Sequence, residues 1–148
     1  MPSVLDHCRN LPEKTFEAGE TLLHEGRRAG VMYVLIEGEV EILKRDVQIN
    51  VVSEPGSIFG EISVLLNVPH MATVKATKRT RLHVVDKARR MLEGNAEVSF
   101  HVARLLAQRL RLVTTYLVDL KKQFEQHEDH LGMVDEVLES LVHHQGKD

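Results

Sequence analysis

The segment from residue 57 to residue 74, SIFGEISVLLNVPHMATV, holds the polar groups best suited to chemistry. Gly60 lets the backbone approach a ligand closely, and Glu61, Ile62 and Ser63 predict the opening of a short helix. The first N–H groups of a helix have no partner within it, so they favour an anion. Glu61 would repel that anion, and its carboxylate suits a sugar hydroxyl instead. The alternative is that Glu61 is a helix-terminal carboxylate favoured by the helix dipole.

Short β-rich runs surround the 57–74 segment and must position it. Between Thr15 and Asp86 these runs are rich in β-branched residues, and alternation is clear in EGEVEILKR. Glycines recur between the runs, where tight turns need positive φ. Many short strands with glycine turns predict an antiparallel sandwich or barrel. We therefore expect a mainly β fold with added α structure: a small antiparallel β-barrel (jelly roll), then a short helix and a long C-terminal helix.

The hydrophobic period changes after Asp86. DKARRMLEGN predicts a short helix that begins near Asp86 and ends near Gly94. From Glu97 to about Leu141 there is no proline, and apolar residues alternate at spacings of four and three, as in a coiled coil. The first six positions, named the helix seam here, are Leu106, Leu110, Val113, Leu117, Leu120 and Phe124. The pattern continues through His127, Leu131, Val134, Leu138 and Leu141.

The helix seam predicts a homodimer formed through the long helix. The alternative is a helix that packs on its own barrel. We expect two domains: residues 1–94 form the barrel with flanking short helices, and residues 95–148 form the coiled coil. Gly132 costs about 1 kcal/mol in a helix interior. A break near 126–132, with Asp129 capping a separate last helix, is therefore the alternative to one continuous helix.

Three stretches together resemble the cyclic-nucleotide-binding domain of the catabolite activator and Fnr (Crp-Fnr) family. They are FEAGETLLHEGRRAGVMYVLIEGEVEIL, PGSIFGEISVLL and ATVKATKRTRLHVVDKARRML, within roughly residues 12 to 126. The resemblance implies that PGSIFGEISVLL begins a phosphate-binding cassette and that Glu61 takes the ribose 2′-hydroxyl of a cyclic nucleotide. The ligand-binding residues implied in the barrel are Phe59, Gly60, Glu61, Ile62, Ser63, His70, Met71 and Ala72.

The chain departs from this family where an arginine and a serine or threonine usually precede an alanine. Here the residues are His70, Met71 and Ala72. The arginine forms a forked pair with the phosphate, and losing about 1.5–3 kcal/mol would weaken binding roughly 10- to 150-fold. Three interpretations of His70 follow: a weaker, pH-dependent phosphate contact, a pocket retuned to another ligand, or a solvent-facing loop histidine in a domain that no longer binds.

Thr114 and Thr115 on the long helix are similar to a Thr-Ser pair that contacts the adenine in catabolite activators, one residue from each subunit. This resemblance implies that both threonines bind the ligand and that cAMP is favoured over cGMP. The alternative is that each hydroxyl bonds back to the preceding helical turn.

We expect no catalysis and no metal site. No nucleophile stands beside a plausible base, and the barrel lacks the His-x-His of cupin metal sites. His24, His70 and His83 lie on separate segments. The net charge is −3 and the chain ends at Asp148, without the winged helix that reads DNA in relatives. We therefore expect no direct DNA binding, the alternative being the sensor fragment of a longer transcription regulator.

No apolar run approaches the roughly 18 residues of a membrane span, and the lone Cys8 can form no internal disulfide, so we expect a cytoplasmic protein. The expected function is that of a regulatory domain in signal transduction. It would bind cAMP, with cGMP less favoured, and act as a homodimer on an unidentified protein partner. The alternative is a degenerate domain that no longer binds cyclic nucleotide and serves as a dimeric interaction module.

Overall fold

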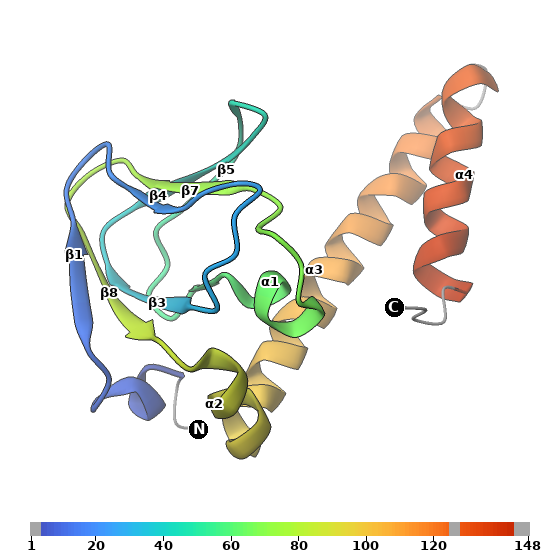
Figure 1. Ribbon diagram of the computed structural model, residues 1–148. Coiled ribbons are helices and arrows are strands. Elements are labelled where there is room, and N and C mark those ends of the chain that lie inside the picture. Colours follow the sequence, from blue (N-terminus) through green and yellow to red (C-terminus); the bar gives the residue numbers. More distant parts are fainter. Residues whose placement is uncertain (1–3, 125–127, 144–148) are drawn as a thin grey trace. The chain divides into compact units, whose positions relative to one another are not determined.

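A computed structural model describes residues 4–124 and 128–143 of the chain, with side chains from 128 to 131 and at 143 excluded. The chain divides into two compact units, Met1–Val102 and Ala103–Asp148. The first unit is a β roll with short helices, and the second consists of helix (Figure 1).

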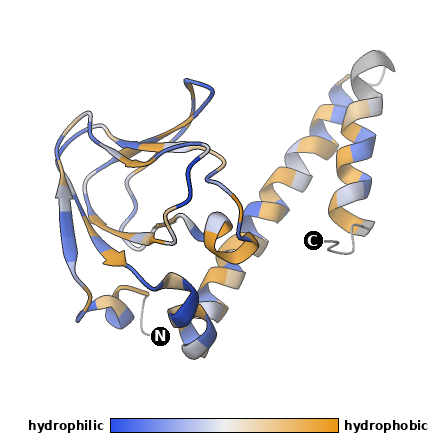
Figure 2. Cartoon of the chain, in the orientation of Figure 1, coloured by the Kyte–Doolittle hydropathy of each residue, from blue (hydrophilic) through white to orange (hydrophobic). Residues whose placement is uncertain are grey.

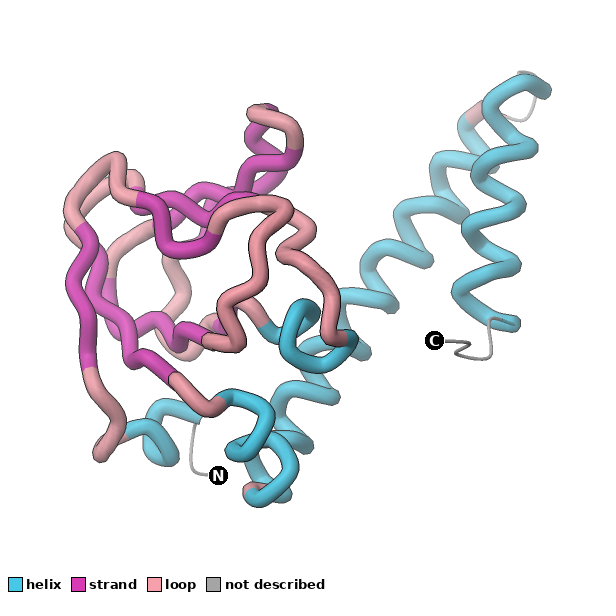
Figure 3. Tube along the Cα trace, viewed as in Figure 1, coloured by secondary structure: helices cyan, strands magenta, loops and turns pink. Residues whose placement is uncertain are grey.

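The strands of the first unit are joined by loops, and short helices flank them (Figure 3). In chain order the elements are the 3-10 helix η1 (Val4–Cys8), β1 (Glu13–Phe16), β2 (Thr21–Leu23), β3 (Met32–Glu37), β4 (Val40–Lys44), β5 (Val47–Val52), β6 (Ile58–Phe59), α1 (Glu61–Leu66), β7 (Thr73–Ala76), β8 (Thr80–Val85) and α2 (Ala88–Gly94).

The strands pair in two four-stranded sheets, in the orders β1-β8-β3-β6 and β2-β7-β4-β5. Every strand pair is antiparallel. Leu35 lies opposite Leu82 in the first sheet, and Val40 lies opposite Ala76 in the second. The predicted jelly roll of antiparallel strands is confirmed.

Burial differs from strand to strand. In β3, a central strand, the first four residues are all buried, whereas β7 alternates between half-buried and buried residues. The edge strand β5 leaves Val47 and Ile49 exposed. The alternation in β7 is typical of a strand with one face on the core between two packed sheets, whereas β3 is covered on both faces over its first four residues.

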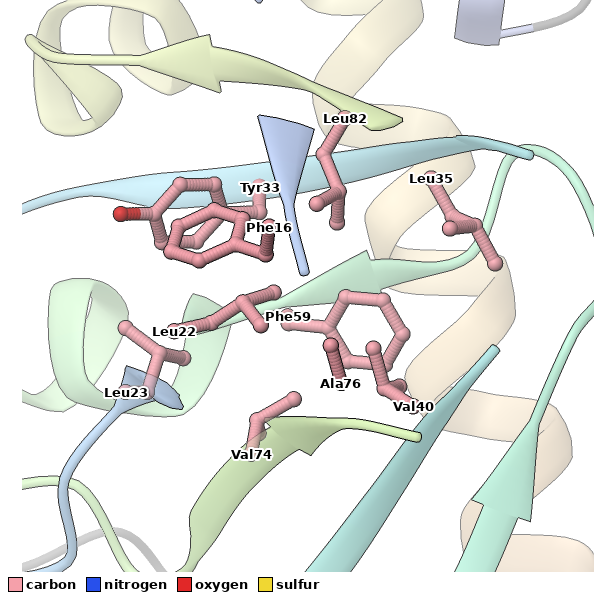
Figure 4. Packing of buried hydrophobic residues seen from close by; sticks show 10 residues of the cluster. All are labelled: Phe16, Leu22, Leu23, Tyr33, Leu35, Val40, Phe59, Val74, Ala76 and Leu82. Atoms are coloured by element: carbon pink, nitrogen blue, oxygen red, sulfur yellow. The ribbon is translucent and has the colours of Figure 1, made fainter. Parts of the chain in front are cut away.

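The core lies between the two sheets and takes side chains from both (Figure 4). The rings of Phe16 and Tyr33 meet edge to face, with centroids 5.7 Å apart. The buried cluster consists of Phe16, Leu22, Leu23, Tyr33, Leu35, Val40, Phe59, Val74, Ala76 and Leu82.

The turn between β3 and β4 depends on Gly38 and on the buried Thr80. Gly38 has φ +115°, and a Cβ atom there would lie 2.6 Å from Thr80 Cα. Thr80 Oγ1 accepts the Glu39 N–H at 3.1 Å and donates to the Lys78 carbonyl at 2.8 Å. A glycine and a hydroxyl together therefore close this hairpin against the start of β8.

Replacing Thr80 with valine should lower the free energy of unfolding by about 1–2 kcal/mol. The side chain keeps its shape, but the N–H of the half-buried Glu39 and the Lys78 carbonyl lose their shared hydroxyl. Chemical denaturation measures the change. Thr115→Val, a matched substitution at an exposed helical position, should change stability by less than about 0.5 kcal/mol. Equal effects of the two substitutions would contradict this role of Thr80.

The single cysteine of the chain lies in η1. Cys8 is 0% exposed, and its carbonyl accepts the Leu11 N–H at 2.9 Å. Burial raises the pKa of the Cys8 thiol. The thiol is therefore part of the packed first unit.

The predicted C-terminal helix is present as two helices, α3 (Ala96–Gln123) and α4 (Glu128–His143). The predicted seam position His127 lies outside the described residues. Gly132 lies inside α4, and α4 begins at Glu128, so Asp129 is its second residue and not its cap. The expectation of one continuous helix is therefore wrong. The expectation that Asp129 caps the last helix is also wrong.

Half of the helix seam on α3 is exposed, and the other three seam residues are half-buried. Leu110 is 44% exposed and Val113 is 49% exposed. Hydrophobic residues recur along α3 and α4 between hydrophilic ones (Figure 2). Lys121 Nζ forms an ion pair with the Asp135 carboxylate, which links the two helices within the second unit.

Candidate ligand site

The 57–74 segment begins with β6, where Ile58 and Phe59 are buried. Phe59 packs in the core cluster. Gly60 follows with φ +94°, and a Cβ atom there would lie 2.6 Å from the Val31 carbonyl oxygen. Only glycine fits this turn without a shift of the backbone. The fold thus requires Gly60 for a packing reason that is independent of any ligand.

Glu61 opens α1 and is buried, at 6% exposure. A buried carboxylate is uncommon and needs favourable polar contacts. The predicted short helix after Gly60 is confirmed, with Ile62 half-buried beside Glu61. Glu61 is therefore a buried carboxylate in the first turn of α1, where the helix dipole also favours a negative charge.

Ser63 is used by the turn that ends α1. Its hydroxyl donates to the Val68 carbonyl at 2.5 Å, and its own carbonyl accepts the Asn67 N–H. Asn67 has φ +54°, the left-handed conformation common at helix ends. Ser63 thus shapes the chain between Glu61 and His70, whatever else it contacts.

His70 is held by the loop that follows β2. Its N–H donates to the Arg27 carbonyl at 2.9 Å, and its carbonyl accepts the Gly26 N–H at 2.9 Å. The residue is only 6% exposed. The interpretation of His70 as a solvent-facing loop histidine is therefore wrong.

The His70 ring is buried without a hydrogen bond at one nitrogen. Within the described part of the chain, Nε2 has no hydrogen-bond partner. Burial lowers the pKa of His70, because the surroundings disfavour the charged ring. The ring is consequently neutral at pH 7, and its protonation would need a compensating anion.

Residues after His70 are tied to neighbouring segments. The exposed Met71 contributes its carbonyl, which accepts a hydrogen bond from Lys44 Nζ at 2.6 Å. Lys44 also pairs with Glu25 at 3.2 Å, and the Glu25 N–H donates to Thr73 Oγ1 at 3.1 Å. The half-buried Ala72 lies between these contacts.

The loop partners of His70 were not found by sequence analysis. HEGRRAG carries glycines typical of a turn, but no local signal shows that Gly26 and Arg27 pair with a residue more than forty positions later. Only the sheet topology brings the two segments together.

Thr114 and Thr115 both bond back to their own helix. Thr114 Oγ1 donates to the Leu110 carbonyl at 2.8 Å, and Thr115 Oγ1 donates to the Arg111 carbonyl at 2.9 Å. The alternative to adenine binding was that each hydroxyl bonds back to the preceding helical turn, and these contacts are of that kind. The two threonines belong to the second unit, whereas Glu61 and His70 belong to the first.

Replacing His70 with glutamine should flatten the pH dependence of stability between pH 7.5 and 5.5. Burial lowers the folded pKa of His70, so the unfolded chain binds this proton first. The folded state then loses stability as pH falls below the unfolded pKa of about 6.5, by at most about 1.4 kcal/mol per pH unit. Thermal melting at several pH values measures the slopes. His24→Gln, at an exposed position, is the control, and unchanged slopes in both variants would contradict the expectation.

Comparison with known proteins identifies the family. Residues 13–91, over half of the chain, match the model described as cyclic nucleotide-binding domain. The chain therefore belongs to the cyclic nucleotide-binding domain family.

Two curated relatives align with this domain. The cAMP-dependent protein kinase regulatory subunit of Yarrowia lipolytica is 37% identical over 79 residues, which cover 53% of this chain and 21% of the relative. A putative potassium channel protein of Rhodopseudomonas palustris is 42% identical over 80 residues, which cover 53% of this chain and 19% of the relative. The chain thus aligns with about a fifth of each relative.

Solved structures share the fold at lower identity. The Thermus thermophilus catabolite activator protein has a TM-score of 0.66 and 22% identity, over 75% of this chain and 55% of that one. The regulatory subunit of a cAMP-independent protein kinase A from Trypanosoma cruzi, bound to guanosine, has a TM-score of 0.51 and 23% identity, over 54% and 29%.

Membrane-spanning helices and metal-binding clusters are both absent from the described residues. No helix among them is long and apolar enough to cross a membrane. They also contain no group of three or more His, Cys, Asp or Glu side chains that could hold a metal ion.

Proposed function

We propose that the chain is a non-catalytic, cytoplasmic regulatory domain of the catabolite activator and Fnr type that binds a cyclic nucleotide, cAMP in preference to cGMP. The observation that carries this proposal is the buried Glu61, which opens α1 directly after the Gly60 turn in a roll of this family. An enclosed carboxylate can accept a hydrogen bond from a ribose hydroxyl. Family membership supplies the ligand class, and the named relatives include a cAMP-dependent regulatory subunit.

Binding of the cyclic nucleotide is expected to be weak. Between Ser57 and Val74 the sequence has no lysine or arginine, and His70 stands where the family usually has the phosphate arginine. A neutral imidazole does not replace a forked, charge-assisted pair. We expect an affinity roughly 10- to 150-fold below that of a site with the arginine.

The proposed output is a homodimer that acts on another protein. Regular spacing of the helix seam and the exposure of Leu110 and Val113 support a second helix of the same kind as the covering surface. Binding in the roll would change how the dimer presents itself to a partner protein, with no direct contact to DNA. The chemistry of that partner is left open.

Calorimetric titration of the purified chain with cAMP and cGMP tests the proposal, with 5′-AMP as a control for a non-cyclic phosphate. Heat from cAMP that exceeds heat from cGMP and 5′-AMP is the expected result. Tighter binding of cAMP at pH 6 than at pH 8 would identify a protonated His70 at the phosphate. No heat and no melting shift at millimolar nucleotide would favour the dimeric interaction module without cyclic-nucleotide binding.

A further inference from the structure

Arg27 and His70 lie opposite each other where the loop after β2 meets the segment before β7. The His70 N–H donates to the Arg27 carbonyl at 2.9 Å, and the Gly26 N–H donates to the His70 carbonyl at 2.9 Å. Two residues of one segment thus oppose a single residue of the other, and the first of the two is a glycine with φ +85°, as in a G1 β-bulge. Because glycine has no side chain, the side chain opposite His70 is that of Arg27.

The turn before Arg27 helps to fix this pairing. The Arg27 N–H donates to the His24 carbonyl at 3.1 Å, which closes a turn from His24 to Arg27. Gly26 is the third residue of this turn, where a type II turn requires a positive φ. The turn and the bulge share Gly26, so backbone hydrogen bonds alone hold Arg27 against His70.

This pairing makes the side chains of Arg27 and His70 neighbours. Residues that oppose each other across paired segments carry their side chains on one face, with Cβ atoms about 4.5–5.5 Å apart. An arginine side chain is longer than that separation, so the Arg27 guanidinium can reach the space that a long side chain at position 70 would reach. His70 is 6% exposed and burial lowers its pKa, so its ring carries no charge at pH 7.

Two other cations near position 70 are already engaged with protein oxygens. Lys44 Nζ donates to the Met71 carbonyl at 2.6 Å and pairs with Glu25 at 3.2 Å. The guanidinium of Arg28 donates to Asn67 Oδ1 at 3.4 Å. Either cation would have to give up a contact within the fold in order to bind a ligand.

The guanidinium of Arg27 has no such engagement. Arg27 is exposed, and within the described part of the chain its side chain forms no ion pair and no hydrogen bond. Glu25, the carboxylate nearest to it in the sequence, pairs with Lys44 and accepts the Arg45 N–H at 3.0 Å. A guanidinium without a protein partner therefore stands beside the position at which the family usually has its phosphate arginine.

We propose that Arg27 provides the guanidinium that meets the phosphate of a bound cyclic nucleotide, in place of the arginine that position 70 lacks. Charge-assisted hydrogen bonds from a guanidinium to phosphate oxygens are roughly twice as strong as neutral ones. Approach from the opposing segment recovers part of the lost contact, in keeping with weak binding. The inference rests on the proposed function, because it uses the same ligand and changes only the residue that neutralises the phosphate.

Calorimetric titration of an Arg27→Gln variant tests this assignment. Glutamine removes the charge and keeps a polar side chain, so the affinity for cAMP or cGMP, whichever the wild type binds, should fall about tenfold or more. Adenosine and guanosine have no phosphate, and their binding should change by less than about threefold. Arg28→Gln removes the same charge from the next residue and should leave the affinity for the cyclic nucleotide within about threefold of wild type.

Two further variants test whether the guanidinium itself is responsible. Arg27→Lys keeps the charge without the fork, so it should lose less affinity for the cyclic nucleotide than Arg27→Gln. Adding His70→Arg to Arg27→Gln moves the guanidinium to the opposing residue and should restore the affinity to the wild-type level or above. Melting curves show which variants are folded. The single changes at Arg27 affect an exposed residue, so the test stands even if the double variant does not fold.

The outcomes separate this inference from the proposed function. If wild type binds a cyclic nucleotide and Arg27→Gln binds it equally tightly, the role of Arg27 is overturned and the proposed function stands. Equal losses in Arg27→Gln and Arg28→Gln would overturn that role as well, since they would show a general effect of charge. Equal losses for the nucleoside and its cyclic monophosphate would do the same, since the effect would not depend on the phosphate. If the folded wild-type chain binds neither cAMP nor cGMP at millimolar concentration, both are overturned.

Discussion

Replacing Glu61 with glutamine should weaken binding of every ribose-bearing ligand by roughly 10- to 150-fold. Hydrogen bonds to a charged group contribute about 1.5–3 kcal/mol, and the amide keeps the size of the side chain while losing the charge. Glu61 is buried at the start of α1, so little solvent competes for its oxygens. Titration of the variant with adenosine and cAMP measures the loss.

A pair of ligands makes this test specific to the ribose contact. Wild type should discriminate between adenosine and 2′-deoxyadenosine, and Glu61→Gln should lose most of that discrimination. Glu54→Gln removes an exposed carboxylate from the preceding turn and serves as the control, with unchanged affinities expected. Equal discrimination in wild type and in Glu61→Gln would remove Glu61 from the ribose. Melting curves of both variants show whether the roll remains folded.

Introducing glutamate at both Leu110 and Leu117 should dissociate the proposed dimer. Both residues lie on the helix seam, and each substitution would place carboxylates of the two chains against each other in an apolar interface. We expect the dimer dissociation constant to rise by at least about 100-fold. Glutamate is a good helix former, so α3 itself should persist. Sedimentation equilibrium measures the change in association.

Leu112→Glu is the matched control for the dimer prediction. Leu112 lies on the same helix, is 71% exposed and falls outside the four-three spacing of the seam. The same change of residue type there should leave the association of the chains intact. Equal weakening by Leu112→Glu and by the seam variant would indicate that another surface joins the chains. A wild-type chain that sediments as a monomer would remove the dimer altogether.

The architecture of the roll was predictable because its signals are local. Glycines at strand ends and alternation in runs such as β4 and β7 follow from the geometry of each strand by itself. The predicted order of barrel, short helix and long helix is the order observed. Which strands pair across the sheets depends on contacts far apart in the sequence, and alternation carries no information about them.

The sequence predicted a possible break in the C-terminal helix but not the residues at which the two helices end and begin. The four-three spacing keeps its phase from Phe124 to Leu131, so a periodic pattern gives no warning that α3 ends at Gln123 and that α4 begins at Glu128. Gly132 drew attention to the region because of its low helix propensity, yet it lies inside α4. The propensity of a single residue is a weak guide, because its surroundings routinely override it.

The state of His70 required the fold. Its sequence neighbours, Pro69 and Met71, suggest an exposed turn, and the pair of backbone hydrogen bonds with Gly26 and Arg27 comes from a distant loop. His70 is buried at this place in the fold, and burial lowers the pKa of its ring. Residue type alone made a protonated histidine plausible, whereas its surroundings make the neutral form the resting state.

Because Cys8 is buried, the rate at which its thiol is modified can be used to measure opening of the first unit. The lone thiol is fully buried and its pKa is raised, so a disulfide reagent in solution can modify it only when the chain around η1 opens. The rate of modification then reports how often the unit opens, at a single known atom and without any introduced label. A small molecule that binds only the closed form lowers the rate of thiol modification in proportion to its occupancy. Modification of Cys8 can therefore reveal the binding of ligands whose identity is unknown.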